Sequence, residues 1–191
     1  MMEKKAIFDR KFTVEVRNQK REELKANPNA EALSTVHAEI VKNHLMKAKM
    51  NLVPSDYSWT VFSDEPVHFG GEGSVPNMFA YFVTGMLLCE TAQYVWNATE
   101  LGLTDKIYKI ETSIEGAFPL APLFGLDDNR NPALTGMQFT AKIESDADPN
   151  EIEKLSKQAA ARCPAHQSLT TRVPYTNRVI LNGKKIAEFS D

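Results

Sequence analysis

The stretch NMFAYFVTGMLLCETAQYVWNATELG, residues 77–102, decides the fold. Asn77 is a good helix N-cap and Gly102 stands where a C-cap glycine is common, so we predict one helix over residues 77–101. Its first half, up to Cys89, is apolar on all sides, which is typical of a helix buried in a core or in an oligomer interface. Its second half is amphipathic. We therefore expect a central helix that passes through a core or an interface and then reaches the surface.

Segments rich in β-forming residues lie on both sides of this helix. Three precede it, at 35–41, 44–52 and 57–62, and the short turns between them predict an antiparallel meander. Two follow it, at 107–114 and 137–144, and a final hairpin within 172–189 turns at Asn182-Gly183. A second helix should begin at Pro149, because Asp148 can cap it and Glu151 completes a capping box.

Two segments stand apart from these elements. Residues 1–32 are rich in charge, and we interpret them as an N-terminal extension of a main domain over residues 33–191. Within the extension, Phe12–Val16 alternates like a short strand and Asn18–Asn27 suits a solvated helix. Residues 115–135 form a long loop that still carries five large apolar residues, which predicts a packed loop, a lid or an interface arm.

Composition and charge exclude several classes of function. The net charge of −3 leaves no basic excess to neutralise phosphates, so we expect neither a nucleic acid nor a membrane surface as a partner. The N-terminus lacks a secretory signal pattern and no apolar run is long enough to span a membrane, so we predict a cytoplasmic location. The histidine and cysteine spacings match no metal site, and the glycines match no nucleotide-binding motif, so we predict no metal and no cofactor.

Cys163, one of only two cysteines, has a local reason to be reactive. Pro164 disfavours the α conformation at Cys163 and suits the first position of a new helix, so Cys163 should cap that helix. Free N–H groups at a helix start, together with Arg162 and His166, would lower the pKa of the thiol. The alternative is an inert buried cysteine at a helix break.

Cys89, the other cysteine, lies in the apolar half of the long helix. Burial alone would raise the pKa of its thiol, and on periodicity alone it is a structural core cysteine. Function would require a charged neighbour. The candidates are Glu90 and Glu72, each of which would have to orient a cation, and His68 or an arginine from elsewhere in the chain.

The order of these features resembles the OsmC/Ohr family, the osmotically inducible and organic hydroperoxide resistance proteins. The most specific matches are ARCPAHQSL at residues 161–169 and the loop DEPVHFGGEGSVP at residues 64–76. The spacing from Cys89 to Gly102-Leu103 also fits. The resemblance covers about residues 34–189.

The resemblance implies an α+β fold in which an antiparallel sheet packs on a long buried central helix, within an intertwined homodimer. It also implies that Cys89 is the peroxidatic cysteine and that Cys163 resolves its sulfenic acid as a disulfide, which an external dithiol reduces. In this chain, Asn77 stands where active relatives have a glutamate, and His68 stands where some have an arginine. Arg17 or Arg21 of the extension are further candidates for the missing cation.

Two functions are therefore predicted. The first is thiol-dependent reduction of organic hydroperoxides in an oxidative-stress response, a peroxiredoxin-like activity. The alternative is a dimeric binding protein that holds an apolar small molecule under the 115–135 loop, with little or no peroxidase activity. The contacts of the Cys89 sulfur should distinguish them.

Overall fold

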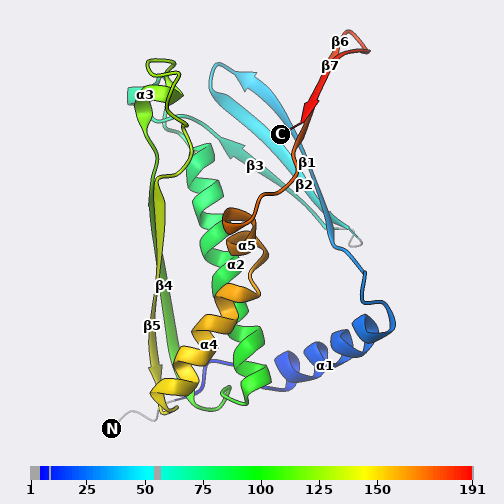
Figure 1. The fold of residues 1–191 in the computed structure, drawn as a ribbon, viewed down its shortest axis with the longest axis vertical. Helices are drawn as coiled ribbons and strands as arrows, with labels where there is room; N and C mark the ends of the chain where they lie inside the picture. The colour runs from blue at the N-terminus through cyan, green and yellow to red at the C-terminus, as the bar shows by residue number, and fades with distance from the viewer. Residues whose placement is uncertain (1–4, 9, 54–56, 191) are drawn as a thin grey trace.

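A computed structural model describes residues 5–8, 10–53 and 57–190, so residues 1–4 and 9 of the predicted extension lie outside the described residues. The elements in chain order are α1 (Arg10–Ala26), β1 (Leu33–Lys42), β2 (Leu45–Val53), β3 (Ser58–Ser63), the 3₁₀ turn η1 (Val67–Phe69), α2 (Met78–Leu101), β4 (Ile107–Ala117), α3 (Leu120–Leu123), β5 (Gly136–Ser145), α4 (Pro149–Ala161), α5 (Pro164–Thr170), β6 (Thr176–Leu181) and β7 (Lys184–Ser190). Helices and antiparallel strands are mixed in one chain (Figure 1). The predicted α+β class is therefore confirmed.

The long helix α2 forms as predicted and runs through the middle of the molecule (Figure 1). Asn77 caps its start, because the side-chain oxygen accepts a hydrogen bond from the Ala80 N–H at 2.8 Å. Gly102 ends it in the left-handed region at φ 69°, a conformation that glycine adopts without strain. Both ends of the helix were visible in the sequence because both depend on local hydrogen bonds.

In the described part of the chain, the strands form three separate antiparallel sheets. The first is the predicted meander β1-β2-β3, the second is the β4–β5 pair and the third is the β6–β7 hairpin. Asn182 and Gly183 both have positive φ, as the predicted tight turn requires. The sheet that packs along the central helix is β4–β5, which contacts α2 through β4 and runs beside it in Figure 1.

The buried core lies around the second half of α2. Tyr94 and Ala98 of α2 pack there with Leu155 and Ala159 of α4, and with Leu103 and Ile107 before and at the start of β4. The capping box at Asp148 and Glu151 forms as predicted and fixes the start of α4. This part of the chain is therefore the most firmly packed.

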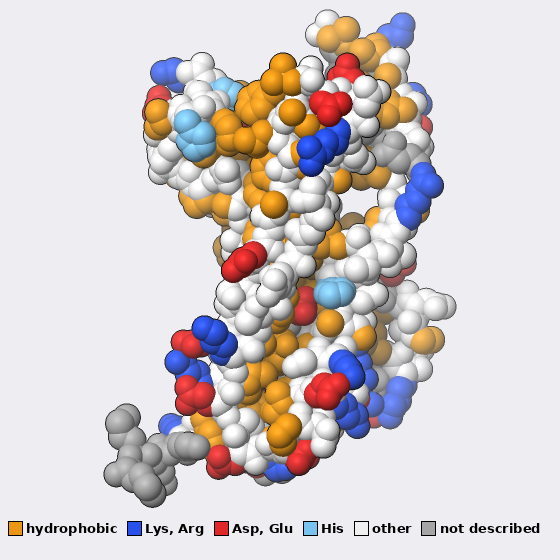
Figure 2. Space-filling model, turned by 60° about the vertical axis from the view of Figure 1, so that its left-hand side comes forward, with side chains coloured by type: hydrophobic (Ala, Val, Ile, Leu, Met, Phe, Trp, Pro, Cys, Tyr) orange, Lys and Arg blue, Asp and Glu red, His pale blue; other side chains and the backbone are white. Residues whose placement is uncertain are grey.

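The first half of α2 is not buried within the single chain, so of the two predicted alternatives only burial in an oligomer interface stays open. Met78, Phe82 and Leu88 are 38, 46 and 61% exposed, whereas the buried residues of α2 begin at Met86. Figure 2 shows hydrophobic side chains gathered on the upper part of one face of the molecule. An apolar sequence predicts that a helix face is covered, but it does not say whether the same chain covers it. In the described part of the chain, no helix is both long enough and apolar enough to cross a membrane.

The N-terminal extension contains one helix, so the predicted strand at Phe12–Val16 is wrong. These residues lie inside α1. An alternation over five residues is too short to distinguish the two-residue period of a strand from the 3.6-residue period of a helix. The lysines, arginines and glutamates that follow favour a helix. The 115–135 loop is also shorter than predicted, because β4 continues to Ala117 and α3 interrupts the rest.

Candidate functional site

The two cysteines lie near each other, one on α2 and one beside it. Cys89 lies in the middle of α2 and is partly exposed, while Cys163 lies between α4 and α5 and is fully buried. The Cys89 thiol lies near enough to the Cys163 thiol to raise its pKa, and both cysteines are free. Residues 74 positions apart in the sequence are thus brought near each other.

Cys163 occupies the helix start that the sequence predicts. Helix α4 ends at Ala161 with Arg162 as its C-cap, Cys163 has an extended backbone, and Pro164 is the first residue of α5. The Cys163 sulfur accepts a hydrogen bond from the His166 N–H at 3.4 Å. Cys163 is therefore the N-cap of α5, and its position follows from the proline after it.

The predicted lowering of the Cys163 pKa is wrong. Burial raises the pKa of the thiol, and the neighbouring Cys89 thiol raises it further. The N–H groups of His166 and Ala165 act in the opposite direction but do not outweigh burial. Cys163 is thus a thiol that needs a base before it can attack another sulfur.

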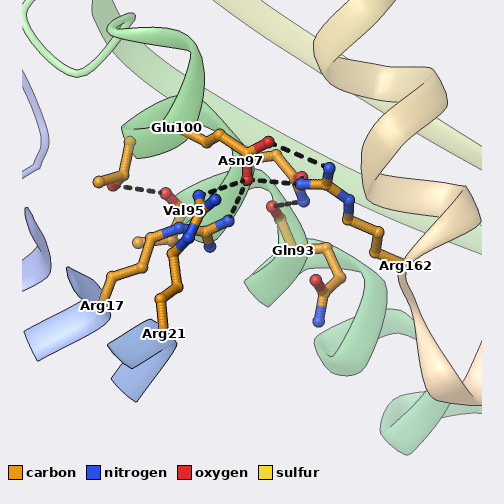
Figure 3. Close-up of polar contacts among 8 residues, drawn as sticks. Arg17, Arg21, Gln93, Val95, Asn97, Glu100 and Arg162 are labelled. Atoms are coloured by element: carbon orange, nitrogen blue, oxygen red, sulfur yellow. Dashed lines mark hydrogen bonds and ion pairs between the residues drawn. The ribbon is translucent and has the colours of Figure 1, made fainter. Parts of the chain in front are cut away.

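The guanidinium group of Arg162 binds Glu100 and Asn97 rather than the Cys163 sulfur. Its guanidinium donates to Glu100 at 2.7 and 3.0 Å and to the Asn97 side-chain oxygen at 2.7 Å (Figure 3). Arg17 and Arg21 of α1 also bind Glu100, so they do not supply a cation to Cys89. These residues form one cluster, the Glu100 cluster, at the C-terminal end of α2.

No local pattern in the sequence predicts the Glu100 cluster. Its three arginines come from residues 17, 21 and 162, and Glu100 looks like an ordinary surface residue of an amphipathic helix. Arg17 also lies over the Trp96 ring, with the guanidinium carbon 5.7 Å from the ring centroid. The cluster joins α1 and the end of α4 to α2.

Glu90 and His166 form a side-chain pair near the two cysteines. The His166 Nδ1 lies 3.0 Å from a carboxylate oxygen of Glu90, whose side chain is only 8% exposed. Glu90 follows Cys89 on α2, and the His166 backbone N–H bonds the Cys163 sulfur. The structure therefore brings together four predicted site residues: Cys89, Glu90, Cys163 and His166.

The remaining predicted site residues lie at the other end of α2. Asn77 caps the helix about 18 Å along its axis from Cys89, given the helical rise per residue. His68 lies in η1 and packs on Phe69, with the ring centroids 4.3 Å apart. Within the chain these two residues are separated from the cysteines.

Glu72 lies in the glycine-rich loop, which Asp64 holds in place. The buried Asp64 carboxylate accepts hydrogen bonds from the N–H groups of Glu72 and Ser74 and from the Ser74 hydroxyl. Burial alone would raise the pKa of Asp64, but these hydrogen bonds outweigh it and lower the pKa. At Gly71 a side chain would collide with the Glu65 carbonyl oxygen, which explains why a glycine stands there.

Two of the cavities formed by the described residues lie along α2 and are relevant to the site. The larger, about 600 Å³, lies at the N-terminal end of α2, partly under the connection between β4 and β5. Its apolar lining is Phe69, Met78, Phe79, Phe118, Leu123, Phe124, Pro132 and Leu134, and its polar lining is His44, Glu65 and Asn77. The smaller, about 300 Å³, is lined by Glu90 and His166 together with mostly apolar residues of α2, β4, β5 and α5.

The described residues show no metal centre. Among them, no group of three or more histidine, cysteine, aspartate or glutamate side chains is arranged to hold a metal ion. The chemical groups available near the cysteines are therefore two thiols, one carboxylate and one imidazole.

The family model and the solved structures that resemble this chain point to the same family. A family model described as OsmC-like protein matches residues 71–177, more than half of the chain. The fold is similar to that of an OsmC-like protein from Mycoplasma pneumoniae, with a TM-score of 0.55 and 19% identity, covering 75% of this chain and 90% of that one. It is also similar to an organic hydroperoxide resistance protein from Legionella pneumophila, with a TM-score of 0.53 and 18% identity, covering 74% and 91%. No curated protein matches the sequence.

Proposed function

The chain belongs to the OsmC-like protein family, and from this we propose that it is a thiol-dependent reductase of organic hydroperoxides. The observation that carries the proposal is that the Cys89 and Cys163 thiols lie near each other, beside the Glu90–His166 pair. A partly exposed thiol beside a buried one suits a reaction in which the first sulfur meets a peroxide and the second resolves the product. The description of the Legionella relative as an organic hydroperoxide resistance protein agrees with this chemistry.

The two cysteines take different roles in the proposed reaction. The Cys89 thiolate attacks the terminal oxygen of the hydroperoxide, so that a sulfur–oxygen bond forms and the oxygen–oxygen bond breaks. The products are a sulfenic acid at Cys89 and an alcohol. Cys163 then attacks the Cys89 sulfur, which gives a disulfide and water, and an external dithiol reduces the disulfide. The burial of Cys163 favours this order, because a peroxide reaches Cys89 more readily.

The proposal predicts rapid oxidation of the reduced protein by cumene hydroperoxide. Trp96 lies about 10 Å along α2 from Cys89, so its fluorescence should report the reaction in a stopped-flow experiment. We expect oxidation at least ~10²-fold faster than that of a free cysteine at the same pH, since the site supplies proton transfer that a free thiol lacks. Mass spectrometry should then find a Cys89–Cys163 disulfide. A rate no faster than that of free cysteine would overturn the proposed function.

We further propose that the chain acts as a homodimer in the cytoplasm. Within a single chain, large apolar side chains are exposed on α2, on β1 and on the β6–β7 hairpin. Examples are Phe82, Leu88, Ile40, Ile180 and Phe189. A second copy of the chain would cover such surfaces. Sedimentation equilibrium should give twice the mass of one chain, and the mass of a single chain at micromolar concentration would contradict the dimer.

The larger cavity supports a second candidate function, the binding of an apolar small molecule. Aromatic and aliphatic side chains line it, and Asn77, His44 and Glu65 place polar groups at its wall. Decanoic acid should raise the melting temperature of the reduced protein, and Leu123→Trp should abolish the shift by filling the cavity. Equal shifts in both proteins, or none in either, would count against this function.

A further inference from the structure

The Glu90–His166 pair is built into the wall of the smaller cavity. A carboxylate that is 8% exposed requires a partner, because an unpaired buried charge is costly. The His166 Nδ1 at 3.0 Å is in hydrogen-bonding position to that carboxylate. An ionised carboxylate only accepts hydrogen bonds, so Nδ1 carries the donated proton and Nε2 is the nitrogen left to exchange a proton.

The position of His166 links the cavity to the cysteines. Its backbone N–H holds the Cys163 sulfur at 3.4 Å, and its side chain lies in the cavity wall and is 37% exposed. The cavity is otherwise mostly apolar, with Met86, Ile114, Met137, Phe139 and Leu169 among its lining residues. An alkyl or aryl group fits such walls, and the acid–base pair would face the polar end of the same molecule.

We propose that His166, oriented by Glu90, is the proton-transfer residue of the peroxidase reaction, and that the smaller cavity holds the organic part of the hydroperoxide. This inference rests on the proposed function. The imidazole first takes the proton of the Cys89 thiol. When the thiolate forms its bond to the peroxide oxygen, the oxygen–oxygen bond breaks and the imidazolium returns that proton to the departing alkoxide. Sulfur is oxidised, the peroxide is reduced, and the products are a sulfenic acid and an alcohol.

The same imidazole serves the resolving step. Neutral His166 takes the proton of the Cys163 thiol, and the resulting thiolate attacks the Cys89 sulfur. The sulfur–sulfur bond forms, the sulfur–oxygen bond breaks, and the leaving hydroxide receives the proton from the imidazolium as water. Burial raises the pKa of Cys163, so this thiol benefits from a base held beside it.

Several polar groups lie around His166. Glu90 of α2 bonds its imidazole, and its backbone N–H bonds the sulfur of Cys163, which lies near Cys89. Tyr94 interacts with Glu90 one turn further along α2. From the β4–β5 side, the cavity lining contributes apolar residues such as Ile114 and Phe139. Glu90 is therefore a positioning residue, and the imidazole is the group that exchanges protons with the reacting atoms.

The leaving group of the substrate provides the test. His166→Asn keeps a donor near the Nδ1 position but cannot relay a proton, and His37→Asn on the exposed strand β1 is the matched control. Oxidation of reduced protein is followed by stopped-flow fluorescence with cumene hydroperoxide and with peracetic acid. The alkoxide released from the first needs a proton, whereas the acetate released from the second does not.

We expect His166→Asn to slow oxidation by both oxidants, because the Cys89 thiol loses its base, and to slow oxidation by cumene hydroperoxide at least ~10-fold more than oxidation by peracetic acid, because only the alkoxide also needs the returned proton. Glu90→Gln should show the same selectivity with a smaller loss, and imidazole added to His166→Ala should restore part of the rate with cumene hydroperoxide. An equal loss with both oxidants would overturn the return of the proton to the alkoxide, and no loss with either would overturn the proton-transfer role altogether, while both results would leave the peroxidase itself intact. A wild-type protein that reacts with neither oxidant would overturn the peroxidase and this inference together.

Discussion

Replacing Cys89 with serine should lower the rate of cumene hydroperoxide reduction by at least ~10³-fold, because loss of the attacking nucleophile removes the step on which the other residues act. A serine hydroxyl has nearly the size of the thiol but forms no reactive anion at neutral pH. The variant should keep the fold, since Cys89 is partly exposed and lies within the long helix α2. Coupled consumption of a dithiol measures turnover.

Cys163→Ser is the matched variant, because it removes the other sulfur of the same pair. We expect it to keep the first oxidation of Cys89 within about tenfold of the wild-type rate and to accumulate a sulfenic acid that dimedone traps. Turnover should be lost because no disulfide forms. If Cys163→Ser lost the first oxidation and Cys89→Ser kept it, the roles of the two cysteines would be reversed.

These roles differ from what local sequence reasoning favoured. Cys163 looked like the more reactive residue, since it caps a helix and follows an arginine. The cap forms, but the Arg162 charge is engaged by Glu100 and burial raises the pKa of the Cys163 thiol. Cys89 had only the family resemblance in its favour, and the structure places the second thiol and the Glu90–His166 pair around it.

The parts of the fold that were predicted correctly depend on neighbouring residues. The ends of α2 and α4 and the tight turn at Asn182-Gly183 follow from side chains that bond or shape the backbone within a few positions. The missed features depend on distant residues. The Glu90–His166 contact joins positions 76 apart, and no local pattern marks either residue as the partner of the other.

The largest expected change in stability comes from Glu100→Gln. Hydrogen bonds from Arg162 are the main reason why the pKa of Glu100 falls from 4.5 to about 2, and Arg17 adds to the effect. The neutral amide would leave three guanidinium groups near one another without a carboxylate. Because the Glu100 side chain is 26% exposed and partly screened by water, we expect a loss of about 2 kcal/mol in the free energy of unfolding at pH 7. Urea denaturation at a fixed protein concentration measures it.

The pH dependence distinguishes this ion cluster from simple packing. A carboxyl group whose pKa is lower in the folded state stabilises the fold above its unfolded pKa, near 4.5, and loses that effect as the pH falls toward 2. The difference between wild type and Glu100→Gln should therefore be full at pH 7, shrink below pH 4.5 and nearly vanish near pH 2. Glu153→Gln, which removes an exposed pair with Lys157 on α4, should change little at any pH. If the difference in stability between the two proteins were equal at pH 7 and near pH 2, Glu100 would act by packing. Its charge would then contribute nothing to holding Arg17, Arg21 and Arg162.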